Sequence, residues 1–252
     1  LSLNEAPSAK RIIQSSSPLS NTVSTSLDIL PALIVDPIEP IISFYHHHRA
    51  INLSLLLVGK IMSREVGDVI SFADWPGFQP NMTPREIFSE GSFGGFYWRP
   101  IYSSVISMNL RDEHLEFNDW WDGIDESLLI SEKYDKSRNR YKVKCGTTLE
   151  MWEEKGWIVE QDPYGWVQWY CRFYKGRKSE DDLRQIKRWK AFAGPKGRFR
   201  NHLINRIIAK GGDYCDETIS PVVRQSLQHW GYRLTSEDFE QASLGKWKSS
   251  LG

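Results

Sequence analysis

The chain has 252 residues and a formal net charge of zero, with 40% hydrophobic and 25% charged residues. These values are typical of a globular protein, and the length allows one large domain or two small ones. The balanced charge excludes a uniformly basic or acidic protein. No apolar run approaches the roughly 18 residues of a membrane-spanning helix, so we expect no membrane span.

The cysteine pattern predicts a reducing, intracellular compartment. Cys145, Cys171 and Cys215 are odd in number and form no CxxC pair, which argues against a disulfide framework. Residues 1–27 are rich in Ser and poor in acids, a composition typical of a disordered tail or of an organelle-targeting segment. The tail is the favoured interpretation. The sequence gives no indication of oligomeric state.

Composition divides the chain into three parts. Residues 1–40 are predicted to be a disordered or extended arm, because repeated prolines forbid a long helix there. Residues 41–70 are predicted to be an apolar helical segment. The run His46 to His48 lies in it, but adjacent helical side chains point about 100° apart and cannot all meet one metal ion. Residues 71–245 are predicted to be a Trp-rich helical domain, since no Trp precedes Trp75.

Helix-capping signals run through this last part. Thr83 and Glu86 form a capping box around Pro84, and Gly91 ends that helix. The glycines at 91, 94 and 95 follow a helix and lack a Gly-Lys-Ser/Thr sequence, so they indicate tight turns rather than a phosphate loop. Further start signals predict five or six short helices over residues 147–243: Thr147/Glu150, Asp162/Pro163, Ser179/Asp182, Ser220/Pro221 and Thr235/Asp238.

The fold class predicted from these helices is mainly α, a multi-helical single globular domain. Trp166, Trp169, Tyr170 and Phe173 recur at the spacing of one helical face. A second stripe contains Leu183, Ile186, Trp189 and Ala193. Aromatic side chains at this spacing are predicted to belong to the core.

Charge is distributed in two blocks. Arg172 to Lys210 carries thirteen Lys or Arg and three acids, whereas Asp112 to Glu126 carries seven acids and no Lys or Arg. The blocks could pair internally, or the basic block could bind nucleic acid or another polyanion by neutralising phosphates. Polyanion binding is the favoured functional hypothesis. Its candidate residues are Arg172, Lys175, Arg177, Lys178, Arg184, Lys187, Arg188, Arg198 and Arg200.

An enzyme with an aromatic-lined pocket is the first alternative. Its candidate pocket residues are Trp98, Arg99, His202 and His229. Asp119, Asp122 and Asp125 recur every three residues, and clustered carboxylates are the ligands of a hard divalent cation. No Ser/His/Asp or Cys/His motif is present, and no cofactor other than such a cation is predicted. A structural or protein-interaction module is the second alternative.

Long strings of the chain carry a resemblance. DWPGFQPNMTPREIFSEGSFGGFYWRPI, GTTLEMWEEKGWI, DPYGWVQWYCRFYKGR, DDLRQIKRW, GPKGRFRNHLINRI and SPVVRQSLQHWGYRLT resemble a Trp-rich family of uncharacterised hypothetical proteins. The resemblance covers about residues 74–235 and leaves out residues 1–70. It implies kinship alone, with no activity, cofactor or catalytic residue to carry over.

Overall fold

Two tryptophans from neighbouring helices, Trp169 and Trp189, lie in the centre of the core, with 0% and 1% of their surfaces exposed. Phe78 packs between them, its ring centroid 5.8 Å from that of Trp169 and 5.2 Å from that of Trp189. The computed structural model describes residues 64–250, with side chains over 64–245. The predicted arm over 1–40, the predicted tail or targeting segment and the run His46 to His48 lie outside the described residues.

The described chain is mainly helical, as predicted. A small antiparallel hairpin, not predicted, pairs Ile101 of β1 with Leu110 of β2. No described helix is long and apolar enough to cross a membrane. The elements are α2 (Pro84–Ser89), β1 (Ile101–Ser103), β2 (Met108–Leu110), the 3-10 helices η1 (Glu113–Trp120), η2 (Glu126–Leu128) and η3 (Lys136–Arg138), then α3 (Leu149–Glu154), α4 (Trp166–Tyr174), α5 (Asp182–Phe192), α6 (Arg198–Lys210), α7 (Pro221–His229) and α8 (Ser236–Ser250).

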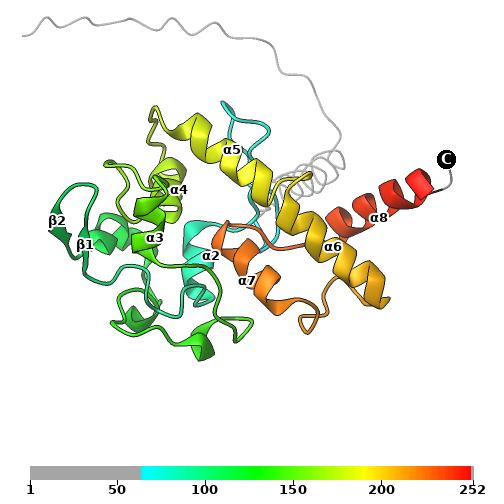
Figure 1. Ribbon diagram of the computed structural model, residues 1–252, viewed down its shortest axis with the longest axis horizontal. Helices are drawn as coiled ribbons and strands as arrows, with labels where there is room; N and C mark the ends of the chain where they lie inside the picture. The colour runs from blue at the N-terminus through cyan, green and yellow to red at the C-terminus, as the bar shows by residue number, and fades with distance from the viewer. Residues whose placement is uncertain (1–63, 251–252) are drawn as a thin grey trace, which may run out of the picture. The chain divides into compact units, whose positions relative to one another are not determined.

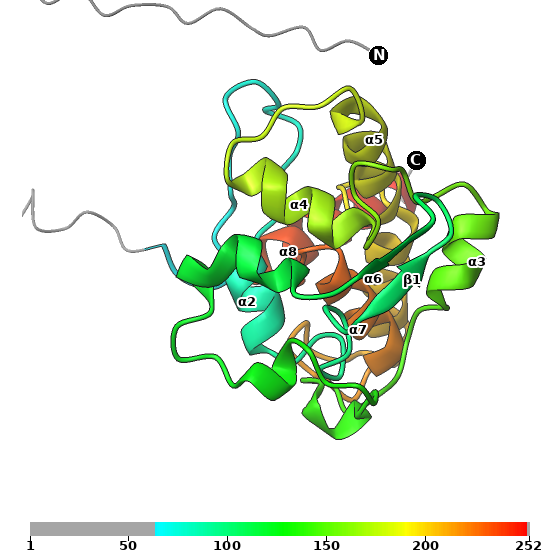
Figure 2. The same cartoon turned by 90° about the vertical axis from the view of Figure 1, so that its left-hand side faces the viewer.

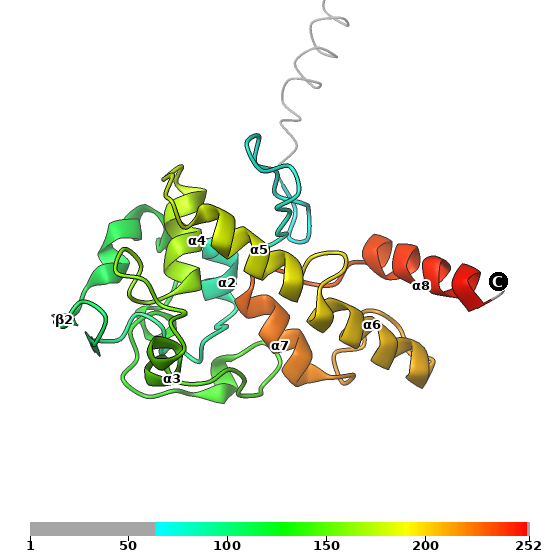
Figure 3. The same ribbon diagram turned by 45° about the horizontal axis from the view of Figure 1, so that its top comes forward.

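The longer helices pack around the tryptophan core (Figure 1). α4 packs on α2 and α5, and α6 packs on α5, α7 and α8. α8 leaves the body of the fold beyond α6 (Figure 3). The hairpin lies beside α3, where the Ser103 hydroxyl donates to Glu153 at 3.1 Å (Figure 2). The irregular stretch between β2 and α3 contacts the C-terminal end of α2, where Arg140 pairs with Glu90 at 3.0 Å.

The α4 helix shows how aromatic spacing produced this core. Its four predicted core residues, Trp166, Trp169, Tyr170 and Phe173, are all buried, which confirms that interpretation. Burial of each such ring stabilises the fold by about 2 kcal/mol or more. α4 begins after Gly165, whose φ of +84° is accessible mainly to glycine.

Several predicted helix starts are displaced. Thr148, not Thr147, caps α3 by accepting from the Met151 N–H. Asp162 does not cap α4, because its carboxylate is taken up by two arginines. Ser179 contacts Asp182 through two hydrogen bonds, but α5 starts only at Asp182.

Other sequence predictions have mixed outcomes. The capping box of Thr83 and Glu86 is present. Gly91 lies in a tight turn, where a Cβ atom would stand 2.1 Å from the Arg138 carbonyl oxygen. Leu183, placed in the α5 core stripe, is 48% exposed, so that assignment is wrong. Residues 64–69, the described end of the predicted 41–70 helix, form a turn and extended chain instead.

Candidate ligand-binding site

A cavity of about 600 Å³ opens between α3, α4, α5, α6 and α7. This volume lies within the range of small-molecule sites, which are usually concave and mostly apolar. About half of its lining residues are aromatic. The aromatic lining residues are Phe93, Tyr97, Trp152, Trp157, Tyr164, Trp166, Phe192, Phe199 and Trp230.

Four of these rings form a continuous row. The centroids of Phe199 and Phe192 lie 3.9 Å apart, with 13° between their planes. Phe192 stacks in turn on Trp230 at 4.9 Å, and Trp230 meets Trp166 at 4.7 Å. Because Phe192 is stacked between Phe199 and Trp230, the row presents ring edges to the cavity rather than open faces. An aromatic ligand can therefore make edge-to-face contacts with this wall.

Two arginines bring positive charge to the aromatic wall. The guanidinium of Arg188 is half-buried, 5.4 Å from the Trp230 ring centroid and 5.8 Å from that of Trp157. Arg198 is exposed and lies 5.1 Å from the Phe199 ring centroid. Both side chains line the cavity. A cation is attracted to the face of an aromatic ring. A guanidinium in that position can still donate hydrogen bonds from its edges to an anion.

Neither arginine has an acidic partner among the described side chains. None of the ion pairs found over residues 64–245 includes Arg188 or Arg198. Arg188 donates to the neutral Gln185 amide oxygen at 2.8 Å and, at 3.5 Å, to the Trp157 carbonyl. Burial, together with the positive charge of Arg184, lowers the pKa of Arg188 to about 10. The guanidinium therefore stays charged at neutral pH with no acid in ion-pair contact, although the charge of Asp181 partly opposes the lowering.

Helix geometry explains why these side chains meet. On α5, Arg188, Ala191 and Phe192 are three or four residues apart and share the cavity side. Trp189 points the other way, into the core, where its indole N–H donates to the Trp230 carbonyl at 2.8 Å. This bond joins α5 to the end of α7.

The break between α5 and α6 positions Arg198. α6 begins after Gly197, which has no side chain to cap the helix. A Cβ at Gly197 would lie 2.5 Å from the Phe192 carbonyl oxygen, so only glycine allows this close turn. The first turn of α6 contains no acidic residue. The partial positive charge of the helix N-terminus therefore lies beside Arg198 and Phe199 at the cavity wall.

His229 closes another side of the cavity. Its Nε2 lies within hydrogen-bond distance of the Ser92 carbonyl oxygen, and its ring stacks on Phe93 with centroids 4.4 Å apart. Burial lowers the pKa of His229 to about 4. The imidazole is therefore neutral at physiological pH.

Cys145 lies beside His229, although 84 residues separate them in the sequence. Its Sγ is 3.6 Å from Nδ1 and 3.8 Å from Nε2. A sulfur in line with one nitrogen's lone pair would be far from the other, so these distances place it over the ring face. Burial raises the pKa of Cys145 to about 11. The pair therefore lacks the in-plane hydrogen bond and the thiolate of a nucleophilic Cys–His pair.

The basic block is neutralised in part by ion pairs within the protein. Arg172 bonds to Glu116 at 2.6 Å and Lys175 to Asp119 at 2.8 Å, which joins it to the acidic block. Six of the nine candidate polyanion-binding residues have acidic partners: Arg172, Lys175, Arg177, Lys178, Arg184 and Arg200. Lys187, Arg188 and Arg198 have no ion pair among residues 64–245.

The structure does not gather the three candidate cation ligands. Asp119 pairs with Lys175, and Asp125 caps η2 by accepting from the Ser127 N–H. The Lys175 ammonium lowers the pKa of Asp119. Asp122 is exposed. Over the described residues, no group of three or more His, Cys, Asp or Glu side chains could hold a metal ion.

The four candidate pocket residues are scattered. His229 lines the aromatic cavity, Trp98 is fully buried in the core, and His202 is exposed on α6. Arg99 lines a separate groove of about 640 Å³ between the hairpin and α3. Sequence spacing could not show this, because the residues come from different elements.

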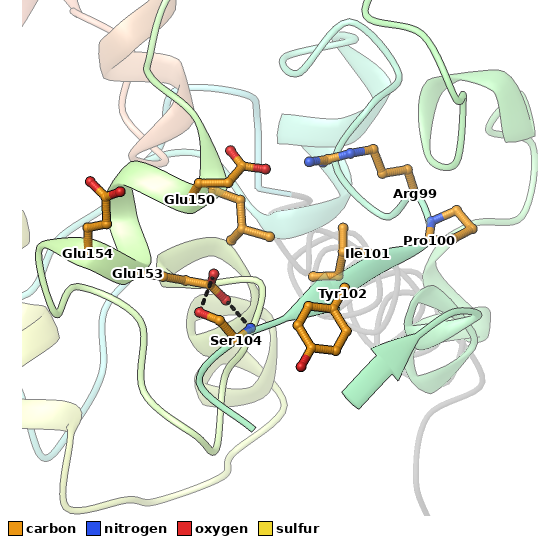
Figure 4. A pocket seen from close by; sticks show the side chains of 9 residues that line it. Arg99, Pro100, Ile101, Tyr102, Ser104, Glu150, Glu153 and Glu154 are labelled. Carbon is orange, nitrogen blue, oxygen red and sulfur yellow. Dashed lines mark hydrogen bonds between the residues drawn. The ribbon is translucent and has the colours of Figure 1, made fainter. Parts of the chain in front are cut away.

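The groove beside the hairpin is polar. Arg99 and Glu150 reach toward one another across it, and Glu153 accepts from the Ser104 N–H at 3.0 Å and from its hydroxyl at 2.7 Å (Figure 4). Burial lowers the pKa of Arg99, whose guanidinium lies 3.7 Å from the Phe96 ring centroid. The Glu153 carboxylate thus holds the loop after β1 through its bonds to Ser104. Because these bonds already occupy the carboxylate, the aromatic cavity is the better candidate site.

Comparison with known proteins identifies no match. No family model matches the chain, and no match is found among curated proteins or solved structures. The resemblance to a Trp-rich family stays a prediction.

Sequence reasoning missed most of the cavity wall. Trp157, Phe192 and Phe199 were not singled out, because each lies at a helix end or in a connection. The sequence does contain one signal. Arg188 and Phe192 precede the Gly194 to Gly197 break, and Arg198 and Phe199 follow it, so an arginine and an aromatic residue occur on each side.

Proposed function

We propose that this protein binds a small organic anion with a flat aromatic body in the cavity between α3, α4, α5, α6 and α7. One observation carries the proposal. The Arg188 guanidinium is half-buried among indole rings and has no acidic partner among the described side chains.

The anionic part of the ligand follows from the cost of burying charge. A buried cation is stabilised when an opposite charge and hydrogen bonds replace the water it has lost. Gln185 and the Trp157 carbonyl supply only neutral acceptors to Arg188. A carboxylate or phosphate group would supply the missing charge and could bond to the guanidinium through two oxygens. Arg198 and the start of α6 add to the same positive field.

The aromatic part follows from the wall. The row from Phe199 through Phe192 to Trp230 offers ring edges for edge-to-face contacts, and aromatic pairs gain about 1 kcal/mol beyond their buried area. The cavity volume of about 600 Å³ suits a molecule of one to three fused rings.

A small ligand is favoured over a nucleic-acid strand. A strand needs a continuous run of cations along its backbone. Here six of the thirteen cations of the basic block have acidic partners within the domain, which interrupts such a run. Of the seven without an ion pair over residues 64–245, only Arg188 and Arg198 line the cavity.

Calorimetric titration with matched ligands tests this function. Naphthoate and naphthyl phosphate are expected to bind, and uncharged naphthamide to bind at least about tenfold more weakly because it lacks the charge. Naphthyl phosphate and naphthoate together distinguish phosphate from carboxylate recognition.

Two variants locate the site. Arg188→Gln removes the guanidinium from the cavity, whereas Lys187→Gln makes the same charge change on the exposed neighbour. Arg188→Gln is expected to weaken naphthoate binding about tenfold or more, and Lys187→Gln less than twofold. Equal effects of both variants, or no binding of either acid by the unaltered protein, would overturn the proposal.

A further inference from the structure

His229 is held in one tautomer by a buried backbone carbonyl. The Ser92 carbonyl oxygen can only accept, so the His229 Nε2 that bonds to it carries the proton. The same oxygen also accepts from the Gln225 amide at 2.9 Å. Ser92 and Gln225 are both fully buried, with 0% of their surfaces exposed. The Nδ1 atom of His229 therefore carries a lone pair and acts as an acceptor.

The ring that carries this acceptor has a fixed orientation. Phe93 stacks on it with 28° between the ring planes, and the bond to Ser92 sets its rotation. The Cys145 thiol is the only hydrogen-bonding neighbour found for Nδ1 within residues 64–245. It lies over the ring face and is a weak donor, so it does not occupy the lone pair in the ring plane.

An acceptor whose neighbour is only a weak thiol donor can select ligands by their donors. Both His229 and Arg188 line the same aromatic cavity. Trp230 connects them, because it follows His229 in the chain and its ring lies 5.4 Å from the Arg188 guanidinium. The cavity thus presents a cation at one place and a neutral acceptor at another, with aromatic rings in between.

Resting on the proposed function, we infer that His229 is a specificity-determining residue whose Nδ1 accepts a hydrogen bond from a hydroxyl or amine on the ligand. The ligand class is then an aromatic acid that carries such a donor away from its anionic group. A ligand donor that finds no acceptor loses its hydrogen bond to water on burial. A site with an acceptor at that place therefore distinguishes the ligand that carries the donor from an analogue that lacks it.

This geometry identifies His229 as a binding residue rather than a nucleophile's base. The neighbouring Cys145 sulfur is not in line with Nδ1, and no other hydroxyl or thiol is bonded to that nitrogen among the described side chains. The low pKa of about 4 agrees with this role, because an acceptor must stay unprotonated at neutral pH.

Ligand triplets test the inference by calorimetry on the full chain. Each triplet contains a hydroxynaphthoate, the methoxynaphthoate of the same substitution pattern and naphthoate itself, across the ring positions. At least one hydroxy isomer is expected to bind about tenfold tighter than its methoxy counterpart, as one hydrogen bond is worth about 1 kcal/mol or slightly more. His229→Phe keeps a ring to stack on Phe93 and is expected to abolish the preference for the hydroxy over the methoxy acid.

Controls separate this inference from the function on which it rests. His202→Phe alters an exposed histidine on α6 and is expected to keep the preference. If the acids bind but every hydroxy isomer equals its methoxy counterpart, the role of His229 is overturned and the proposed function stands. If no acid binds, the proposed function itself fails. Should His229→Phe not fold, the nitrogen NMR shift of Nδ1 in the unaltered protein decides: it must move with the hydroxy acid and not with the methoxy acid.

Discussion

Arg177 and Asp162 form a two-pronged ion pair, with Nη1 2.8 Å from Oδ1 and Nη2 2.6 Å from Oδ2. The Asp162 side chain is fully buried, and Arg172 donates to its Oδ1 at 3.0 Å. One carboxylate thus holds two of the cations that the sequence offered for polyanion binding. Their role in this fold is to tie the end of α4 to the loop before it.

Neutralising this carboxylate is expected to destabilise the domain strongly. Asp162→Asn leaves two guanidinium groups beside a buried amide, and breaking a buried pair by removing one partner costs about 3 to 5 kcal/mol. Urea denaturation measures the free energy of unfolding. The matched control is Asp74→Asn, because the Asp74–Lys178 pair is 67% and 58% exposed and exposed pairs contribute about 1 kcal/mol or less. Similar losses in both variants would contradict the buried role of Asp162.

His229 is expected to make stability depend on pH. Its pKa is about 4 in the folded chain and 6.5 in a model peptide, so the unfolded state binds more protons between these values. The free energy of unfolding therefore falls as pH drops from about 6.5 to about 4, by up to about 3 kcal/mol. Above pH 6.5 this contribution is fully present. Below pH 4 it is lost.

A difference measurement isolates the His229 contribution from the carboxylates that titrate nearby. Urea titrations at several pH values are made on the unaltered protein and on His229→Gln, and the difference between them is followed. This difference should shrink toward low pH. His202→Gln, an exposed control, should show the same pH dependence as the unaltered protein. A constant difference across pH 4 to 7 would show that His229 is not buried in its neutral form.

The core could be predicted from the sequence, whereas the site could not. The spacing of Trp166, Trp169 and Phe173 identified a buried face, because burial repeats with the helical period whatever the face packs against. The position of a charged residue's partner in the sequence follows no such period, so it cannot be predicted from spacing. Arg172 bonds to Glu116, 56 residues away, and Cys145 meets His229 through the same long-range packing.

Helix starts were displaced for a related reason. Asp162 has the composition of an N-cap, but two arginines compete for its oxygens and hold it elsewhere. The alternatives left open by the charge blocks are partly resolved by the contacts. Arg172 and Lys175 pair with the acidic block, whereas Arg188 and Arg198 face the cavity.

Trp157 at the cavity and Trp189 in the core are expected to separate binding from stability. Trp157 lines the cavity and is 42% exposed, so Trp157→Ala should weaken naphthoate binding by roughly tenfold while the free energy of unfolding changes little. Trp189→Ala should cost about 3 to 5 kcal/mol, because its ring is in the core. Calorimetric titration and urea denaturation of both variants measure the two effects. Loss of stability without loss of binding in Trp157→Ala would remove that residue from the site.

Salt dependence is expected to distinguish a small-ligand site from a polyanion surface. Only Arg188 and Arg198 bring formal positive charge to the cavity wall, so naphthoate affinity should fall less than about tenfold between 50 and 200 mM salt. A protein that makes six or more phosphate contacts would lose about a thousandfold over that range. Titrations of naphthoate and of a single-stranded oligonucleotide at several salt concentrations provide the comparison. Tight oligonucleotide binding with a steep salt slope, retained in Arg188→Gln, would favour the basic surface over the cavity as the functional site.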